Sequence, residues 1–179
     1  MREVRKSGHI GNSRRRASPR ARPEDLDELL QLAVRFLARR DRTIAQVAQY
    51  LTLRGASSRQ VGQVIHRLSD LRYLDDHAYA QRWVDTRLST RPMGRERLKA
   101  ELLAKGISDG VAARVLAETF REVSEERLAR RVLEVASRHG RRLPLSQLAR
   151  LLQQRGFGEE VVDRMMAEFR GSEDGLDEE

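Results

Sequence analysis

The chain has 179 residues and no cysteine, which excludes disulfides, Cys-ligated zinc and thiol catalysis and suits a reducing compartment. Charged residues make up 35% of it and hydrophobic residues 39%, so a thin core is possible. The formal net charge of +8 favours an anionic partner such as nucleic acid or a nucleoprotein, although an arginine-rich codon bias would also raise it.

The two ends of the chain are opposite in charge. Residues 1–22 carry eight basic side chains, including Arg14, Arg15 and Arg16, against one acid, and they lack the apolar segment of a secretory signal. We predict a disordered basic arm there, which is either a solvated tail or a non-specific phosphate-binding arm. Residues 171–179 carry five acids and no base, and we predict a disordered acidic tail after a last helix that ends at Gly171.

Residues 23–75 read as a three-helix unit. Pro23 suits a first helical turn, and leucines at helical spacing follow it. Thr43 is predicted to cap a second helix that stops at Gly55, and Ser57 to cap a third.

The unit recurs along the chain. When Gly55, Gly106 and Gly156 are aligned, matching positions hold Leu51, Leu102 and Leu152 before the glycines and Val61, Ala112 and Val162 after them. Thr43, Gly94 and Pro144 fall where each second helix should begin. This register predicts tandem repeats at residues 23–75, 76–123 and 124–170, with first helices at Asp76–Leu88 and about Glu125–Arg138 in the later two. The predicted fold is all-α, an elongated and bent array of three three-helix repeats.

The stretch Arg72–Arg87 holds the only Trp and two of the three Tyr. Asp75 or Asp76 suits the N-terminus of a helix that places Tyr79, Trp83 and Arg87 on one face. We expect the two aromatic rings to pack in the core, with Trp83 buried, while an edge of either ring could still meet a partner.

Signals of catalysis are absent from the sequence. It contains no nucleotide-binding glycine motif and no H-E-x-x-H, and its four histidines are scattered. The Asp75–Asp76 pair could hold Mg²⁺, but helix capping explains it more simply. We therefore expect a protein that is not an enzyme and has no metal or cofactor.

Basic side chains gather on the second and third repeats. Arg127, Arg130 and Arg131 share one helical face, where neighbouring glutamates dilute their charge. Ser57-Ser58-Arg59-Gln60 could begin a DNA-reading helix, but Asp109 and Glu159–Glu160 at the matching positions would repel phosphate.

The string Tyr73-Leu74-Asp75-Asp76, followed by Tyr79-Ala80, Trp83-Val84 and Arg87, resembles the signature of the RecX family of recombination regulators. Lys105-Gly106-Ile107 after Leu102 and Arg155-Gly156-Phe157 extend the resemblance, which covers Pro23 to about Arg170. It implies a cytoplasmic helical-repeat protein of DNA repair that binds the RecA recombinase filament in its groove and suppresses strand exchange and ATP hydrolysis.

The expected partners are thus a RecA-type recombinase filament and, weakly and largely non-specifically, DNA, with the protein acting as a monomer away from membranes. The alternatives are a helix-turn-helix transcription regulator and a helical scaffold for another acidic partner. Candidate partner- or DNA-binding residues are Tyr73, Asp75, Asp76, Tyr79, Trp83, Arg87, Arg95, Arg97, Lys99, Lys105, Arg127, Arg130, Arg131, Arg14, Arg15 and Arg16.

Overall fold

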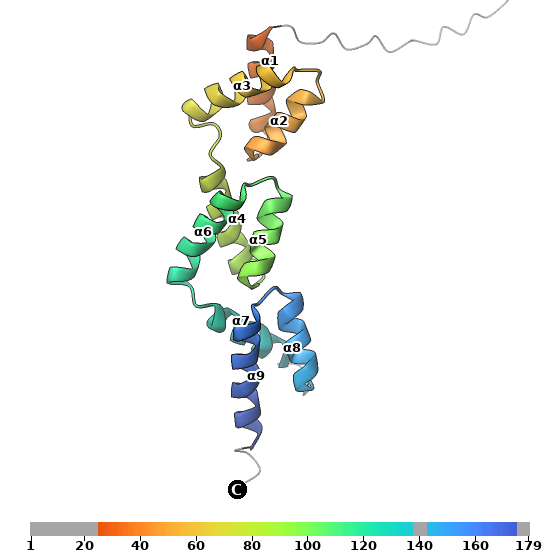
Figure 1. The fold of residues 1–179 in the computed structure, drawn as a ribbon, viewed down its shortest axis with the longest axis vertical. Helices are drawn as coiled ribbons and strands as arrows, with labels where there is room; N and C mark the ends of the chain where they lie inside the picture. Colours follow the sequence, from red (N-terminus) through yellow and green to blue (C-terminus); the bar gives the residue numbers. More distant parts are fainter. Residues whose placement is uncertain (1–24, 138–142, 175–179) are drawn as a thin grey trace, which may run out of the picture.

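The computed structural model describes residues 25–137 and 143–174, and these residues form helices and no strand. The helices follow one another along the long axis in three groups of three (Figure 1). The first group is α1 (Leu26–Leu37), α2 (Ile44–Thr52) and α3 (Ser58–Asp70). The second is α4 (Asp76–Thr90), α5 (Arg95–Ala104) and α6 (Asp109–Glu122), and the third is α7 (Glu125–Ser137), α8 (Leu145–Gln154) and α9 (Glu159–Asp174). The predicted all-α elongated array is confirmed.

Local sequence signals explain where the helices begin. Thr43, Gly94 and Pro144 are the N-caps of α2, α5 and α8, as the repeat register predicted. Ser57 caps α3 in a reciprocal capping box, in which its hydroxyl accepts from the Gln60 N–H while the Gln60 side chain accepts from the Ser57 N–H. Each oxygen satisfies a helix-end donor that would otherwise lack a partner.

The second helix of each group ends in the same left-handed turn. Gly55, Gly106 and Gly156 have φ values of 91°, 83° and 76°, a conformation that side chains with a Cβ rarely adopt. In each turn the N–H of the residue after the glycine donates to the carbonyl of the residue four positions before the glycine, as in Ile107 N–H to Leu102 O at 3.1 Å.

The turns at Gly106 and Gly156 also join their own helical group to the preceding group. The carbonyl of Lys105 accepts from the Thr43 hydroxyl at 2.8 Å, and the carbonyl of Arg155 accepts from the Gly94 N–H at 2.9 Å. The turn at the end of α5 therefore contacts the start of α2, and the turn at the end of α8 contacts the start of α5. The junction is so close that a Cβ on Gly106 would lie 2.3 Å from the Ala45 Cβ.

The described residues form two separate hydrophobic cores. Eight buried residues make the core of α1–α3, with Leu29, Leu51 and Leu68 fully buried and Leu74 at its edge. Twenty buried residues make a second core that is shared by α4–α9. The second and third groups thus pack as one body, whereas the first has its own interior.

Two predicted helix ends are wrong. Helix α1 begins at Leu26, because the Asp25 side chain accepts from the Asp27 N–H and caps it there. Pro23 lies outside the described residues. Helix α9 continues through Gly171 to Asp174, because a glycine inside a helix costs only about 1 kcal/mol relative to alanine and does not stop it.

The predicted basic arm, Arg138 and residues 175–179 lie outside the described residues. In the part of the chain that the structure does describe, no helix has the length and apolar character needed to cross a bilayer.

Candidate functional site: the α3–α4 connection and the basic faces

The connection between α3 and α4, Leu71–Asp75, holds the first group against the second. Its Tyr73 and Leu74 N–H groups both donate to the Leu68 carbonyl, at 2.9 and 3.3 Å. Arg72 has a φ of 60°, which is an uncommon conformation for a residue with a Cβ. The turn drives Leu74 into the first core at 3% exposure and leaves Tyr73 at 58% exposure, so Tyr73 is available to a partner.

Asp75 and Asp76 have different roles, although both were candidates for the cap of α4. The Asp75 carboxylate accepts from the Ala78 N–H at 2.9 Å and caps α4. The Asp76 carboxylate instead accepts from the Ile44 N–H at 2.9 Å, at the start of α2. Burial raises the pKa of Asp76, and the adjacent Asp75 raises it further against the lowering effect of the Ile44 bond. Asp76 therefore links the second helical group to the first by a hydrogen bond.

Trp83 is not buried, contrary to the prediction. Its ring is half-buried at the rim of the second core, next to the half-buried Tyr79. The Arg87 guanidinium lies 4.8 Å and the Lys105 ammonium 5.2 Å from the ring centroid. Two cations thus lie against the ring where it leaves the core, and the turn at Lys105–Gly106 brings one of them alongside α4.

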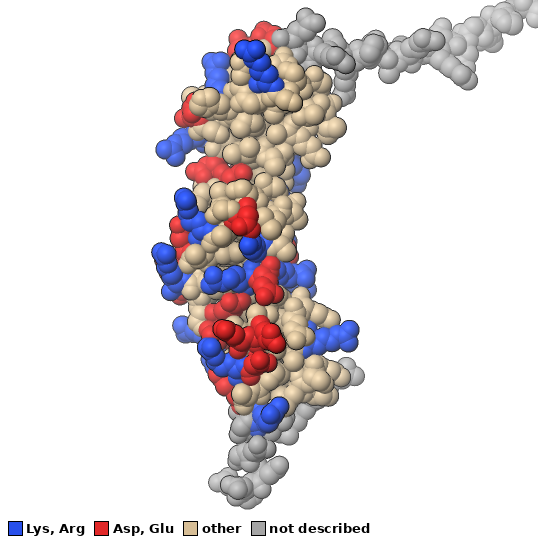
Figure 2. Space-filling model, viewed as in Figure 1, with Lys and Arg blue, Asp and Glu red and all other residues tan. Residues whose placement is uncertain are grey.

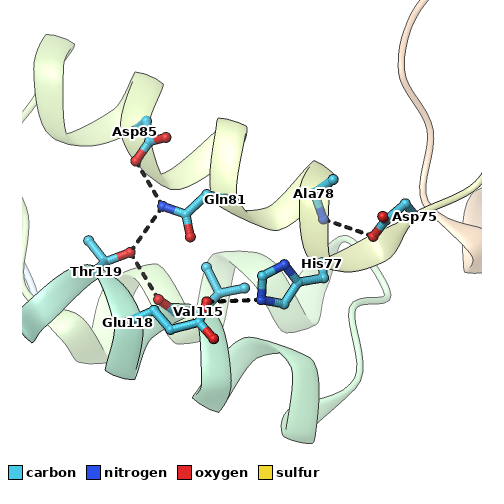
Figure 3. Close-up of polar contacts among 8 residues, drawn as sticks. All are labelled: Asp75, His77, Ala78, Gln81, Asp85, Val115, Glu118 and Thr119. Atoms are coloured by element: carbon cyan, nitrogen blue, oxygen red, sulfur yellow. Dashed lines mark hydrogen bonds and ion pairs between the residues drawn. The ribbon is translucent and has the colours of Figure 1, made fainter.

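Polar side chains fasten α4 to α6 on the flank of the Arg72–Arg87 stretch (Figure 3). His77 Nε2 lies 3.0 Å from Glu118 Oε2, and Gln81 reaches Thr119 at 3.4 Å. The Thr119 hydroxyl donates to the Val115 carbonyl at 2.9 Å. The sequence reading missed this network, since His77 and Glu118 are 41 positions apart and no motif links them.

A hollow of about 410 Å³ opens where α1, the α3–α4 connection and α4 meet. Three predicted site residues, Tyr73, Asp75 and Tyr79, line it together with Arg42 and Arg82. Arg82 is held by Asp41, with 2.7 Å between Nη2 and Oδ2. Arg42 has a buried Nε with no hydrogen-bond partner, and desolvation lowers its pKa. The hollow thus offers aromatic surface beside cationic side chains.

Five of the eight predicted basic candidates that the structure describes are already paired with carboxylates. Arg87 and Arg97 both contact Glu101, at 3.3 and 3.2 Å. The other pairs are Arg95–Glu125 at 3.9 Å, Lys99–Asp109 at 2.8 Å and Arg130–Glu168 at 2.8 Å. Figure 2 shows the result on the face it draws, where basic and acidic side chains alternate over the second and third groups.

The three arginines predicted to share a face of α7 are all exposed, but they are not equivalent. Arg127 and Arg131 have no carboxylate partner among the described residues, whereas Arg130 bonds to Glu168. Reversing the charge at position 130 would place two carboxylates together, so that change would also remove an exposed ion pair. Arg14, Arg15 and Arg16 lie outside the described residues.

Known proteins with similar sequences point to one family. A family model described as "RecX, first three-helix domain" matches residues 30–68, and one described as "RecX, second three-helix domain" matches residues 75–116. Regulatory protein RecX of Treponema pallidum (strain Nichols) is 36% identical over 136 residues, which is 76% of this chain and 82% of the relative. Regulatory protein RecX of Mycobacterium sp. (strain KMS) is 30% identical over 171 residues, covering 91% of this chain and 93% of the relative.

The solved structures agree on the fold. The crystal structure of RecX from Lactobacillus salivarius matches with a TM-score of 0.72 at 22% identity, over 80% of this chain and 95% of that one. The relatives with this sequence similarity are named regulatory proteins. The chain belongs to the RecX family of regulatory proteins.

Proposed function

We propose that this protein binds the filament of a RecA-type recombinase on DNA, lies in its groove, and inhibits strand exchange and ATP hydrolysis. Membership of the RecX family, across both matched three-helix domains, carries the proposal. The elongated array supports it, because a rod of three helical groups can contact several neighbouring subunits of a filament at once. The protein acts as a cytoplasmic monomer without chemistry of its own.

In the proposed mechanism, the protein sits in the groove as a rigid body and stabilises one conformational state of the filament. A regulator of this kind changes a conformational equilibrium only by as much as its affinities for the two states differ. The interlocked turns at Gly106 and Gly156 keep the groups in register, so the rod resists bending to follow a groove of another pitch. A body seated in the groove also blocks entry of a second DNA.

The α3–α4 connection is the proposed contact with the recombinase. Tyr73 is exposed beside a hollow that holds aromatic and cationic side chains, and exposed Tyr and Arg are the residues that most often dominate the energy of protein interfaces. Arg127 and Arg131 on α7, which pair with no carboxylate of the described residues, supply positive charge further along the rod.

The test is a titration of the DNA-dependent ATPase and strand exchange of the cognate recombinase. We expect the wild type to inhibit both below equimolar ratio, since one rod covers several subunits. Tyr73→Ala should raise the half-inhibitory concentration about tenfold or more, as interface hot spots do. Leu103→Ala is the matched control, because Leu103 is 42% exposed on α5 and belongs to neither proposed contact.

The regulator proposal fails if the wild type leaves both activities unchanged at equimolar ratio. If the wild type inhibits and Tyr73→Ala inhibits equally well, the contact lies elsewhere on the rod.

A further inference from the structure

Positive charge is least compensated in the middle of the first helical group, between the acids Asp27 and Glu28 on one side and Asp70 on the other. Residues 31–60 contain six arginines and a single acid, Asp41. Asp41 is itself engaged by Arg82 of α4 at 2.7 Å, so it does not offset the arginines of its own group. This contrasts with the second and third groups, where most of the basic residues with predicted roles are neutralised.

An ordered stack of rings and guanidinium groups joins α1 to α2. The rings of Phe36 and Tyr50 stack with centroids 4.1 Å apart and planes 3° from parallel. The Arg42 guanidinium lies 4.1 Å from the Phe36 centroid, and the Arg54 guanidinium lies 4.7 Å from the Tyr50 centroid. Contact with the Tyr50 ring restricts the Arg54 side chain in advance, which lowers the entropy cost of binding a ligand to it.

A hollow of about 300 Å³ lies beside this stack and is lined by Arg35, Phe36, Arg39, Tyr50 and Arg54. None of its lining residues is acidic. Arg35 lies in the last turn of α1 and Arg39 two residues after its end, and both side chains are exposed. Neither they nor Arg54 pair with a carboxylate among the described residues.

We propose that this arginine–aromatic hollow binds single-stranded nucleic acid, with Arg35 and Arg39 on successive phosphates and a base stacked on the guanidinium of Arg54. Arginine forks bind phosphate in a bidentate manner, and their planes stack on unpaired bases. An acidic peptide would use the charges but not the stacking plane, and a duplex keeps its bases inside. The site binds the strand directly and without the recombinase.

The test measures binding of a labelled oligo(dT) to the full-length chain over a series of salt concentrations, without recombinase. Arg35→Gln/Arg39→Gln should weaken binding at low salt by about tenfold or more, because hydrogen bonds to charged groups are lost. The slope of log K against log salt should become shallower by about 1.4, at about 0.7 for each single-strand phosphate contact.

The matched control is Arg130→Gln/Arg164→Gln. It removes the same charge from exposed arginines that are already held by Glu168 and Glu126, at 2.8 and 2.7 Å. We expect the control to keep the wild-type slope. Equal losses in the two double variants would overturn the proposal, because the effect would then come from net charge alone.

Base stacking is tested with an abasic strand of the same length and phosphate count. The wild type should bind oligo(dT) about tenfold more tightly than the abasic strand, as stacking on one base would give, and Arg54→Gln should remove most of that preference. Equal wild-type binding to both strands would overturn the stacking assignment. Competition by polyglutamate as effective as competition by the unlabelled strand would show a general acidic-partner surface instead.

Discussion

At the scale of single residues, Asp76 shows how one carboxylate can link two helical groups. Its Oδ1 accepts from the Ile44 N–H at 2.9 Å, which is one of the helix-end donors of α2 that has no partner within the helix. Asp76→Ala should therefore destabilise the protein by about 1–2 kcal/mol, the usual cost of losing a cap. Asp76→Asn should not destabilise the protein at neutral pH, because its amide oxygen can accept the same bond without placing a charge there. Urea denaturation of the two variants measures the difference.

The raised pKa of Asp76 gives this comparison a pH dependence. The pKa of the Asp76 carboxyl is higher in the folded protein than the ordinary 3.8 of the unfolded chain. As the pH rises, the unfolded chain therefore loses this proton at a lower pH than the folded protein does. The stability of the wild type should therefore fall, relative to Asp76→Asn, as pH rises from 3.8 through the raised value, and the two should converge below 3.8. A difference that does not vary with pH, or that grows in acid, would contradict this assignment.

Trp83 makes a second residue-scale prediction. Its ring is half-buried at the rim of the core and lies against Arg87 and Lys105. Trp83→Ala should cost about 2 kcal/mol, below the roughly 3–5 kcal/mol of a fully buried aromatic. The change in denaturation midpoint, followed by circular dichroism, measures it. Trp83→Phe should recover part of the loss by keeping a ring at the rim, and a loss of 4 kcal/mol or more for alanine would show that the ring is buried in solution.

At the scale of helices, the backbone of Gly94, the N-cap of α5, lies very close to the backbone of the turn that follows α8. A Cβ there would lie 2.1 Å from the Gly156 carbonyl oxygen and 2.4 Å from the Phe157 nitrogen. Gly94→Ala should force the two groups apart and weaken the Gly94–Arg155 bond, at a cost of about 3 kcal/mol from overpacking and a lost hydrogen bond. Thermal unfolding of the variant checks it.

Gly62 provides the control for that substitution. It lies inside α3, and a Cβ there would meet no atom within 4 Å. Gly62→Ala should raise stability by about 0.5–1 kcal/mol, because alanine is the better helix former and loses less entropy on folding. If both alanine variants are destabilised alike, the close contact at Gly94 is not what governs the loss.

The same scale shows what the sequence could predict. The caps at Thr43 and Ser57 and the left-handed turns at Gly55, Gly106 and Gly156 were predictable, because each depends on residues within a few positions. The Asp76–Ile44 bond and the Arg130–Glu168 pair were not, because they join residues 32 and 38 positions apart on different helices.

The candidate site divides in the same way. Composition located arginines on every repeat, but only the fold shows which of them face a carboxylate. The stack of Phe36 on Tyr50 escaped the sequence reading because two helices must pack before the rings meet.

At the scale of the whole molecule, the two cores differ in size and in how they are joined. The first group encloses eight buried residues, and the second and third groups share twenty. The contacts across the boundary include polar ones, such as Thr43 with Lys105, Ile44 with Asp76 and Asp41 with Arg82. Hydrophobic burial provides most of the stability of a folded unit, so the smaller core should be the weaker one. The rod thus consists of a firm body, α4–α9, and a less stable end.

This arrangement predicts two unfolding transitions rather than one. Trp83, the only tryptophan, belongs to the larger body, so its fluorescence should change at a higher urea concentration than the midpoint of the far-UV circular dichroism. Leu68→Ala should lower the first transition, by about 2–5 kcal/mol for a fully buried leucine, and leave the Trp83 transition in place. Leu133→Ala, equally buried in the larger core, should move the Trp83 transition instead. Coincident curves from both probes, shifted equally by both variants, would mean that the polar contacts between Ile44, Thr43 and α4–α5 couple the two cores into one cooperative unit.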